Sequence, residues 1–472
     1  MQLPDQFIKR TKSLFGEIEY ESFREALEED SSVSIRVNRN KLDFSSKGLI
    51  PVPWCKDGYY LDGRYTFTFD PLFHAGCYYV QEASSMFLAQ VLKQYVNDVS
   101  VMLDLCAAPG GKSTLARSVL PEGSLLVANE VMRNRSQILA ENIIKWGNPY
   151  TIVTNNDPAD FTPLGPVFDV LLTDVPCSGE GMFRKDQVAV DEWSEDNVMM
   201  CAQRQQKILK DIWPCLKSGG LLIYSTCTYN REENEDNVEW IARELGAEIL
   251  PVGIEDSWNI TGNITEKDFP VYRFLPHKTK GEGLFMAVLR KTAEDHMTEL
   301  PNKGRKDKKK QIKSGGKAVL PPDDVRQFIM DSSEFSFDVE GNVFRAFPEM
   351  YEDIRRLLIS RLRVLHYGIS MSELKGRDWS PMHALSMSTF LNREKFASEE
   401  LDYEQAISYL RREAVTLAND VPRGYVLLTY RKAVLGFVKN IGNRANNMYP
   451  QEWRIRSGYL PEDLRILNAS GM

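Results

Sequence analysis

Two cysteines in this chain are placed where they could do covalent chemistry. Cys177 and Cys227 each follow an apolar run, VFDVLLTD (167–174) and GGLLIYST (219–226). Both runs have the pattern of buried strands, and strand ends at one edge of an open α/β sheet share a crevice where ligands bind. Thiolates there, beside the carboxylate of Asp174, could add to an electrophilic ring. Two buried structural cysteines are the alternative, since free cysteine is among the most buried residue types.

A loop of small residues between a strand and a helix is the second such feature. The segment DLCAAPGGKSTLA (104–116) leaves an apolar run, and its alanines and glycines let a ligand approach the backbone closely. The helix that follows offers free N–H groups and a positive dipole end. A phosphate-binding P-loop would end in the GKS found at 111–113 but needs a glycine at Cys106, so that motif fails. The run VLLTD (170–174) nevertheless imitates the magnesium-holding run of NTPases.

S-adenosylmethionine is the competing ligand for this loop. Its ribose hydroxyls call for an acid at the end of the second strand. Glu130 follows the run SLLVAN in that place, and Asp157 follows TIVTNN at the end of the third, near the expected adenine. Glu130 alone could be a first-turn helix acid, worth about 0.3–1 kcal/mol. Both acids at successive strand ends, together with the loop, favour this cofactor.

The composition is ordinary for a soluble globular chain. Its 472 residues are 43% hydrophobic and 26% charged, with no apolar stretch of membrane-spanning length and no secretory signal. Seven cysteines without CxxC spacing argue against a disulfide framework and a zinc site, so we expect no metal and a reducing, cytoplasmic compartment. The net charge of −8 requires any RNA-binding surface to be a local patch.

Strands and helices alternate regularly from about residue 84. The predicted strands are 100–106, 124–129, 151–157, 167–174, 219–226 and 283–291, and a long helix is predicted near 197–217. This alternation is typical of a parallel, doubly wound sheet. We therefore expect an α/β fold with a Rossmann-like sheet in a domain of residues 86–291.

Four further segments flank this domain. They are a small α+β lead domain (1–85) with a helix at Gln6–Leu27 and a strand at Val33–Asn38, a basic flexible linker (292–321), an intermediate subdomain (322–392), and a C-terminal module (393–472) with a hairpin, GYVLLTY and AVLGFVKN. The linker is either a solvated tether or an added hold on RNA phosphates. Lys and Arg residues interleaved with Tyr449 and Trp453 could bind phosphates and stack bases, or form an ordinary solvated surface.

Three motifs together give the chain a family resemblance. DLCAAPGGK, TDVPCSGEGMFRK and STCTYNREENE resemble the Sun-type (Nol/Nop/Sun) RNA cytosine-5 methyltransferases, and the linker and C-terminal region look like those of the bacterial RsmF-like ribosomal RNA members. The resemblance covers roughly residues 75–291, and the C-terminal match to a PUA-like RNA-binding module is softer. By this resemblance Cys227 is the nucleophile, Cys177 helps release the product, and Asp174 contacts both cofactor and base. The resemblance assigns the cofactor contacts to Cys106, Ala107, Ala108, Pro109, Gly110, Gly111, Lys112, Glu130, Arg135, Asp157 and Asp174.

The implied reaction transfers a methyl group from S-adenosylmethionine to carbon 5 of a cytosine in RNA. A thiolate that adds to carbon 6 turns the ring into an enamine, and carbon 5 can then attack. The thiol needs a cation or base nearby, and we expect Arg184 or Lys185 to supply the charge. Small-subunit ribosomal RNA is the expected substrate of a monomeric enzyme. A tRNA substrate and a non-catalytic RNA-binding assembly factor are the alternatives.

Overall fold

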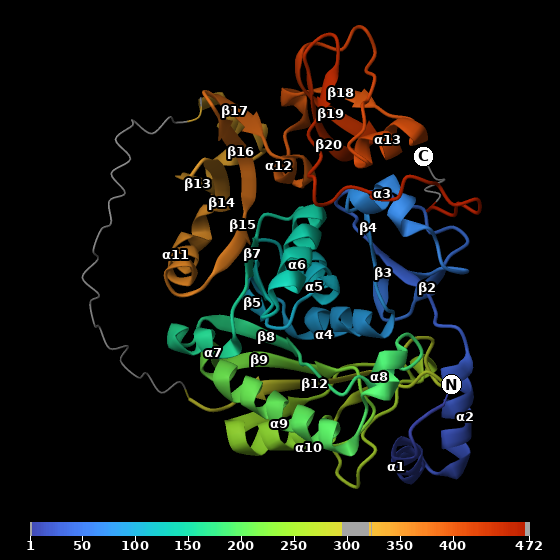
Figure 1. Ribbon diagram of the computed structural model, residues 1–472. Helices are drawn as coiled ribbons and strands as arrows, with labels where there is room; N and C mark the ends of the chain where they lie inside the picture. Colours follow the sequence, from blue (N-terminus) through green and yellow to red (C-terminus); the bar gives the residue numbers. More distant parts are fainter. Residues whose placement is uncertain (1, 295–320, 322, 468–472) are drawn as a thin grey trace.

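A nine-stranded mixed sheet forms the centre of the protein (Figure 1). The computed structural model describes residues 2–294, 321 and 323–467. The strand order is β10-β12-β9-β8-β5-β6-β7-β15, with β11 paired to β12. The strands are β5 (Val101–Asp104), β6 (Leu125–Asn129), β7 (Thr151–Thr154), β8 (Phe168–Asp174), β9 (Leu216–Thr226), β10 (Ala247–Leu250), β11 (Tyr272–Phe274), β12 (Leu284–Lys291) and β15 (Val364–Tyr367).

The five central strands, β9-β8-β5-β6-β7, are parallel, as the sequence predicts. The strands beyond them differ, because β12 runs antiparallel to β9 and β15 runs antiparallel to β7. The carboxyl ends of all five parallel strands therefore lie at one edge, and the loops that leave that edge hold the residues singled out above.

Helices cover both faces of the sheet. The helices of this region are α4 (Leu88–Tyr95), α5 (Gly111–Val119), α6 (Arg133–Trp146), α7 (Pro158–Phe161), α8 (Gln187–Asp191), α9 (Glu195–Ile212) and α10 (Glu235–Trp240). Alternate residues of β8 point to opposite faces: Leu171 packs with α9 and α10, and Leu172 packs with α4 and α5. Figure 1 shows α9 and α10 on the lower side of the sheet and α4 and α5 above it.

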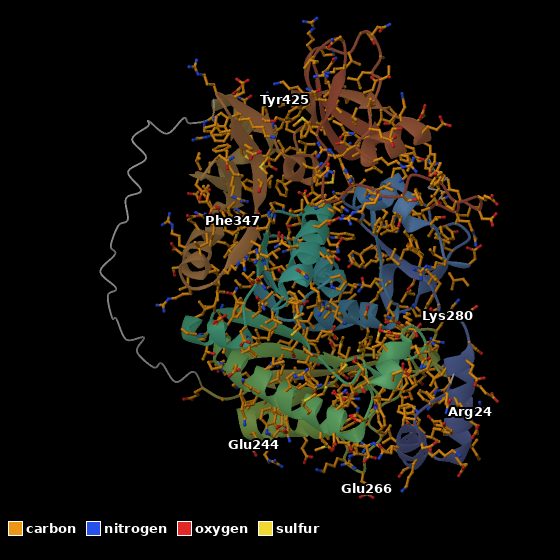
Figure 2. All side chains as sticks on the ribbon, in the orientation of Figure 1. Arg24, Glu244, Glu266, Lys280, Phe347 and Tyr425 are labelled. Atoms are coloured by element: carbon orange, nitrogen blue, oxygen red, sulfur yellow. The ribbon has the colours of Figure 1, made fainter. Side chains whose placement is uncertain are left out.

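The segment after the linker contributes directly to the central sheet. Its own sheet, in the order β13-β14-β16-β17, lies beside β15. Its elements are β13 (Phe335–Glu340), β14 (Val343–Pro348), α11 (Glu352–Arg361), β16 (Ile369–Lys375), β17 (Asp378–Pro381) and α12 (His383–Met387). Phe347, labelled in Figure 2, belongs to the same apolar cluster as Leu103 and Leu171 of the central sheet. The segment and the sheet thus share one core.

The N-terminal region departs from the prediction in one respect. The sequence predicts one helix over Gln6–Leu27, but the structure has two, α1 (Asp5–Phe15) and α2 (Glu17–Glu28). The break falls at Gly16, whose φ of +81° lies in the left-handed region that glycine tolerates. The other elements are α3 (Pro71–His74) and a sheet of β1 (Ser34–Val37), β2 (Ile50–Val52), β3 (Cys55–Tyr60) and β4 (Tyr78–Val80).

The C-terminal module contains the predicted hairpin. Its elements are β18 (Ala397–Glu400), α13 (Tyr403–Leu410), β19 (Gly424–Tyr430), β20 (Ala433–Asn440) and β21 (Ala445–Asn447), and β19 pairs antiparallel with β20. Its apolar side chains share a cluster with those of the N-terminal region, where Leu72 and Tyr449 are both buried. The predicted basic linker lies almost wholly outside the described residues. Within the described ranges, no helix is long and apolar enough to cross a bilayer.

Candidate active site

Cys177 and Cys227 lie side by side at the carboxyl edge of the sheet. They follow β8 and β9, two parallel neighbours in which Asp174 pairs in register with Ser225. The two Sγ atoms are 3.1 Å apart, and the backbone N–H of Cys227 donates to Cys177 Sγ at 3.4 Å. Both side chains are partly exposed, and all seven cysteines of the chain, each within the described part, are free thiols. A reacting ring could therefore reach both sulfurs.

Lys112 and Asp174 form an ion pair beside the sulfurs. Lys112 Nζ lies 2.7 Å from Asp174 Oδ2, and the Ser225 hydroxyl donates to Asp174 Oδ1 at 2.7 Å. Burial alone would lower the pKa of Lys112, but the charge and hydrogen bond of Asp174 outweigh burial, and the pKa is raised. The charge of Cys227 raises it further, so Lys112 is a cation electrostatically coupled to that thiol.

The expected cations Arg184 and Lys185 are engaged elsewhere. Arg184 Nε donates to Glu282 Oε2 at 2.8 Å, and Lys185 Nζ lies 3.6 Å from Glu282 Oε1. Arg184 also donates to the carbonyl oxygens of Ala26 and Gly281. Both cations thus share one carboxylate, that of Glu282. A cation that does interact electrostatically with Cys227 is Lys112, which the sequence reasoning did not name for this task.

The glycine-containing loop, Cys106–Lys112, is held in shape by hydrogen bonds to its carbonyl groups. Arg135 Nη2 donates to Ala108 O at 2.7 Å, and Asn142 Nδ2 donates to Pro109 O at 2.8 Å. Gly110 precedes α5 in a left-handed conformation, with φ of +116°. Arg135, predicted as a cofactor contact, thus supports this loop. Its Nη1 also lies 3.5 Å from Glu130 Oε2.

The two predicted cofactor acids have different surroundings. Glu130 is buried, and its Oε1 accepts from the N–H of Met132 at 2.8 Å. Asp157 is exposed and caps α7, accepting from the N–H of Ala159 at 3.1 Å in a reciprocal capping box. The side chain preceding it, Asn156, exchanges two hydrogen bonds with the backbone of Arg363, which immediately precedes β15. The post-linker segment therefore braces this side of the site.

Asp104, at the end of β5, is a site residue that the sequence reasoning missed. It is completely buried, Ser113 donates to its Oδ2 at 2.6 Å, and its Oδ1 has no partner among the described residues. Burial raises the pKa of Asp104 to about 7. The sequence did contain a signal for Asp104. This residue ends an apolar run just before the small-residue loop, and Glu130 and Asp157 were singled out for similar positions at strand ends.

These residues fit S-adenosylmethionine. The ends of β5, β6, β7 and β8 present Asp104, Glu130, Asp157 and Asp174 around the loop. An unpartnered buried carboxylate oxygen and a row of acids suit a ligand that carries a sulfonium, an ammonium and ribose hydroxyls. Lys112 is neutralised by Asp174, which is unlike the free lysine of a phosphate site.

Two buried carboxylates connect the loops that carry the cysteines, and the sequence reasoning missed them as well. Glu180 accepts from Trp193 Nε1 at 2.9 Å, from Thr228 Oγ1 at 2.7 Å and from the N–H of Tyr229 at 2.7 Å. Asn230 adds further donors to the same group. Glutamates within GEGMF and REENE carry no sequence signal that tells which backbone groups they bind.

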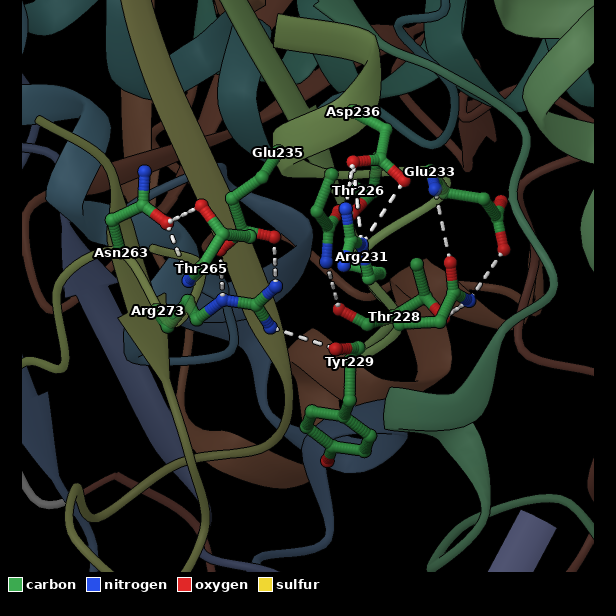
Figure 3. A network of polar contacts seen from close by, with 12 residues as sticks. Thr226, Thr228, Tyr229, Arg231, Glu233, Glu235, Asp236, Asn263, Thr265 and Arg273 are labelled. Carbon is green, nitrogen blue, oxygen red and sulfur yellow. Dashed lines mark hydrogen bonds and ion pairs between the residues drawn. The ribbon is translucent and has the colours of Figure 1, made fainter. Parts of the chain in front are cut away.

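The second carboxylate is that of Glu233, which is labelled in Figure 3. It accepts from the N–H of Ser178 at 3.1 Å, from Gln205 Nε2 at 2.7 Å and from Asn230 Nδ2 at 2.8 Å. Burial raises the pKa of Glu233 to about 6. Because Glu180 and Glu233 both bind the loop after β8 and the loop after β9, they hold the two cysteines in register.

A buried ion pair anchors the far end of this network (Figure 3). Arg273 and Glu235 are each 1% exposed, and Arg273 Nε donates to Glu235 Oε1 at 2.6 Å. Arg273 Nη1 donates to the carbonyl oxygen of Tyr229 at 2.7 Å, which fixes the loop that follows Cys227. Breaking such a pair leaves an unpaired buried charge and costs about 3–5 kcal/mol.

Three parts of the chain match known families. Residues 89–290 match 16S rRNA methyltransferase RsmB/F, residues 3–83 match the N-terminal domain of 16S rRNA methyltransferase RsmF, and residues 396–455 match the methyltransferase RsmF PUA domain. The chain is 30% identical to ribosomal RNA small subunit methyltransferase F of Vibrio cholerae, over 96% of this chain and 98% of that protein. It is 29% identical to the protein of that name from Vibrio parahaemolyticus, over 95% and 97%.

Two solved structures share the fold. A methyltransferase homolog protein from Pyrococcus horikoshii is 27% identical, with a TM-score of 0.52 over 61% of this chain and 95% of that one. NSun6 from the same organism, solved with SFG, is 22% identical, with a TM-score of 0.53 over 62% and 99%.

The fold and the site define an S-adenosylmethionine-dependent RNA methyltransferase with a PUA-like C-terminal module. The chain belongs to the RsmF family of ribosomal RNA small subunit methyltransferases. The predicted family resemblance, fold class and cofactor are thereby confirmed, and the NTPase alternative is wrong.

Proposed function

We propose that this protein methylates carbon 5 of a cytosine in small-subunit ribosomal RNA through a covalent bond to Cys227. The observation that carries the proposal is the pair of sulfurs 3.1 Å apart at the edge where the cofactor loop and Asp174 also meet. The names of the relatives support the class of RNA, since they are small-subunit ribosomal RNA methyltransferases.

In this proposal the Cys227 thiolate attacks carbon 6, forming a carbon–sulfur bond and moving the ring electrons toward carbon 5. When bound, S-adenosylmethionine supplies an electrophilic methyl group to that carbon. Asp174, held by Lys112 and Ser225, contacts the edge of the base. Cys177, as a thiolate, then removes the proton from carbon 5. The electron pair of that carbon–hydrogen bond forms the double bond between carbons 5 and 6, and the carbon–sulfur bond breaks with its electrons returning to Cys227 as a thiolate. Covalent catalysis of this kind divides one difficult step into easier ones.

The remaining residues hold the cofactor and the RNA. We propose that Glu130 and Asp157 contact the nucleoside, while the Cys106–Lys112 loop accommodates the amino-acid end. The target cytosine must be unpaired or flipped out, which costs a few kcal/mol. The lead domain (1–85) and the C-terminal module (393–472) would hold the surrounding RNA, as the matches at residues 3–83 and 396–455 support. The free thiols suit a reducing, cytoplasmic compartment, where we expect a monomer.

Bisulfite sequencing of total RNA from a deletion strain tests the proposal. We expect one cytosine of small-subunit ribosomal RNA to lose its protection, and wild-type but not C227A enzyme to restore it. Loss of protection in a tRNA instead would show that the substrate is tRNA and not ribosomal RNA. Unchanged protection in every RNA, with cofactor still bound by the pure protein, would support the non-catalytic assembly factor and contradict the proposal.

A further inference from the structure

The contact between the two sulfurs raises the question of which one keeps its proton. With Sγ atoms 3.1 Å apart, two thiolates would repel each other, so one sulfur keeps its proton when the other is ionised. The geometry lets either sulfur donate. The backbone N–H of Cys227 donates to Cys177 Sγ, which by itself would favour the thiolate on Cys177. The surrounding charges must therefore decide the proton's position.

On the side of Cys227 the nearby charge is positive. Lys112 interacts with Cys227 electrostatically, and a cation whose own pKa the thiol raises stabilises the thiolate in return. The ion pair with Asp174 takes up part of this positive charge. Lys112 therefore favours a thiolate at Cys227 but is not sufficient to exclude one at Cys177.

On the side of Cys177 the nearby charge is negative. Glu233 accepts from the N–H of Ser178, and Gln205 Nε2 donates both to Glu233 and to the carbonyl oxygen of Pro176 at 3.0 Å. The carboxylate is thus fixed to the residues on both sides of Cys177. Both Glu233 and Gln205 are fully buried.

The hydrogen bond to Cys227, then burial, then the charges of Cys227 and Glu233 raise the pKa of Cys177 well above its ordinary value. The titratable and charged groups coupled to the pair or fixed to its loops include Lys112, Asp174, Glu180, Tyr224, Tyr229, Glu233 and the ion pair of Arg273 with Glu235. Of the carboxylates, Glu233 is the one bonded next to Cys177.

We propose that Glu233 is a positioning residue that keeps the proton on Cys177, so that Cys227 carries the thiolate. The inference rests on the proposed function, because it explains why the sulfur of residue 227 attacks. Once the carbon–sulfur bond has formed, Cys227 loses its charge. Cys177 then releases its proton to solvent and accepts the proton of carbon 5.

Competitive alkylation of the full-length protein tests this directly, without RNA. Substoichiometric iodoacetamide is added at pH 7.5, and peptide mass spectrometry gives the ratio of labelled Cys227 to labelled Cys177. We expect wild type to label mainly at Cys227, and E233Q to lower the ratio by roughly threefold or more, as a shift of about half a pKa unit requires. E233D, which retains the charge, should recover much of the ratio.

The matched control is E180Q, which perturbs the same loops through the other carboxylate and should keep the wild-type ratio. An equal ratio in E233Q and wild type, an equal fall in E180Q, or preferred labelling of wild type at Cys177 would overturn the proposal.

A second measurement uses wild type alone, in case E233Q fails to fold. Lowering the pH from 7.5 to 5 protonates Glu233, whose pKa is about 6, and should reduce the labelling ratio. A ratio that stays flat contradicts the inference. Methylation of RNA by a C227A variant would instead contradict the proposed role of Cys227 as nucleophile. It would not change the labelling ratios, which test the role of Glu233 separately.

Discussion

Lys112 Nζ and Asp174 Oδ2, 2.7 Å apart, join the first turn of α5 to the end of β8. The lysine belongs to the small-residue loop Cys106–Lys112, and the aspartate lies three residues before Cys177. Because the charge of Cys227 also acts on Lys112, the loop and the sulfurs form one electrostatic unit. A change at either end should be felt at the other.

Removing the charge of Lys112 should impair chemistry more than folding. In K112M the Asp174 carboxylate loses its partner and the thiol loses its cation, so turnover should fall about 100-fold or more. Single-turnover methylation of RNA at saturating cofactor measures this effect. K217M removes a surface partner of Asp169 and should stay near wild type. A K112M rate close to that of wild type would show that the ion pair has no role in the reaction.

The two cysteines should give opposite covalent phenotypes. C227A should abolish methylation and form no adduct, because the attacking sulfur is gone. C177A should accumulate an RNA–protein complex, because the attack proceeds but release is blocked. Denaturing gel electrophoresis with labelled RNA distinguishes them. A complex formed by C227A and not by C177A would reverse the roles of the two thiols.

Gly181 should not tolerate a side chain. Its N–H donates to the carbonyl oxygen of Cys227 at 2.9 Å, and an added Cβ would lie 2.9 Å from that oxygen and from Gly283 O. Both atoms belong to backbone, so G181A should destabilise the protein by about 1–3 kcal/mol and slow methylation. Thermal unfolding and activity assays measure the two effects. At Gly262 no described atom lies within 4 Å of such a Cβ, so G262A should match wild type and expose any nonspecific effect.

Asp104 should make cofactor affinity depend on pH. Its pKa of about 7 means that the carboxylate becomes charged as the pH rises from 6 to 8, and a cationic ligand should bind more tightly above pH 7. Isothermal titration of S-adenosylmethionine at several pH values checks this. D104N should bind weakly at every pH, and a wild-type affinity that is constant from pH 6 to 8 would count against the assignment.

Asp104 should also make folding stability depend on pH, and stability should fall with rising pH where cofactor affinity increases. Because the folded-state pKa is raised from 3.8 to about 7, the folded protein holds a proton that the unfolded chain releases between these values. Stability contributed by Asp104 is therefore present at low pH and is lost as the pH rises through 7. Thermal melts at pH 5 and pH 8 should show wild type losing more stability than D104N. An identical loss in both proteins would exclude Asp104 as the source.

The sequence predicts the parallel strands and their chemistry better than the contacts between distant segments. Apolar runs ending in Asp174 or Thr226 lead to buried strands, and parallel strands bring their ends together. The two-helix break at Gly16 was missed because the apolar periodicity continues across it. Arg184 was chosen as the cation for the thiol because it is near Cys177 in sequence. Lys112, which interacts electrostatically with Cys227, lies in the first turn of α5 and is distant in sequence from both cysteines.

The buried carboxylates were harder still. Glu180 and Glu233 read as ordinary charged residues, and only the folded loops show that backbone N–H groups satisfy them. The position of Asp104 at a strand end could be predicted from the sequence. The lack of a hydrogen-bond partner for its Oδ1 among the described residues could not. Partners supplied by loops that meet only after folding leave no periodic trace in the sequence.

The strand β15 has a consequence for how the molecule can be divided. It completes the sheet beside β7 although it lies beyond the linker in sequence, and the residue before it, Arg363, holds Asn156. A protein cut within the linker would leave two fragments that must stay associated. Their separation would expose to water the backbone N–H and C=O groups of β7 that pair with β15, together with the apolar side chains of the shared core. Shortened versions of the gene product should therefore tend to aggregate rather than yield an autonomous enzyme.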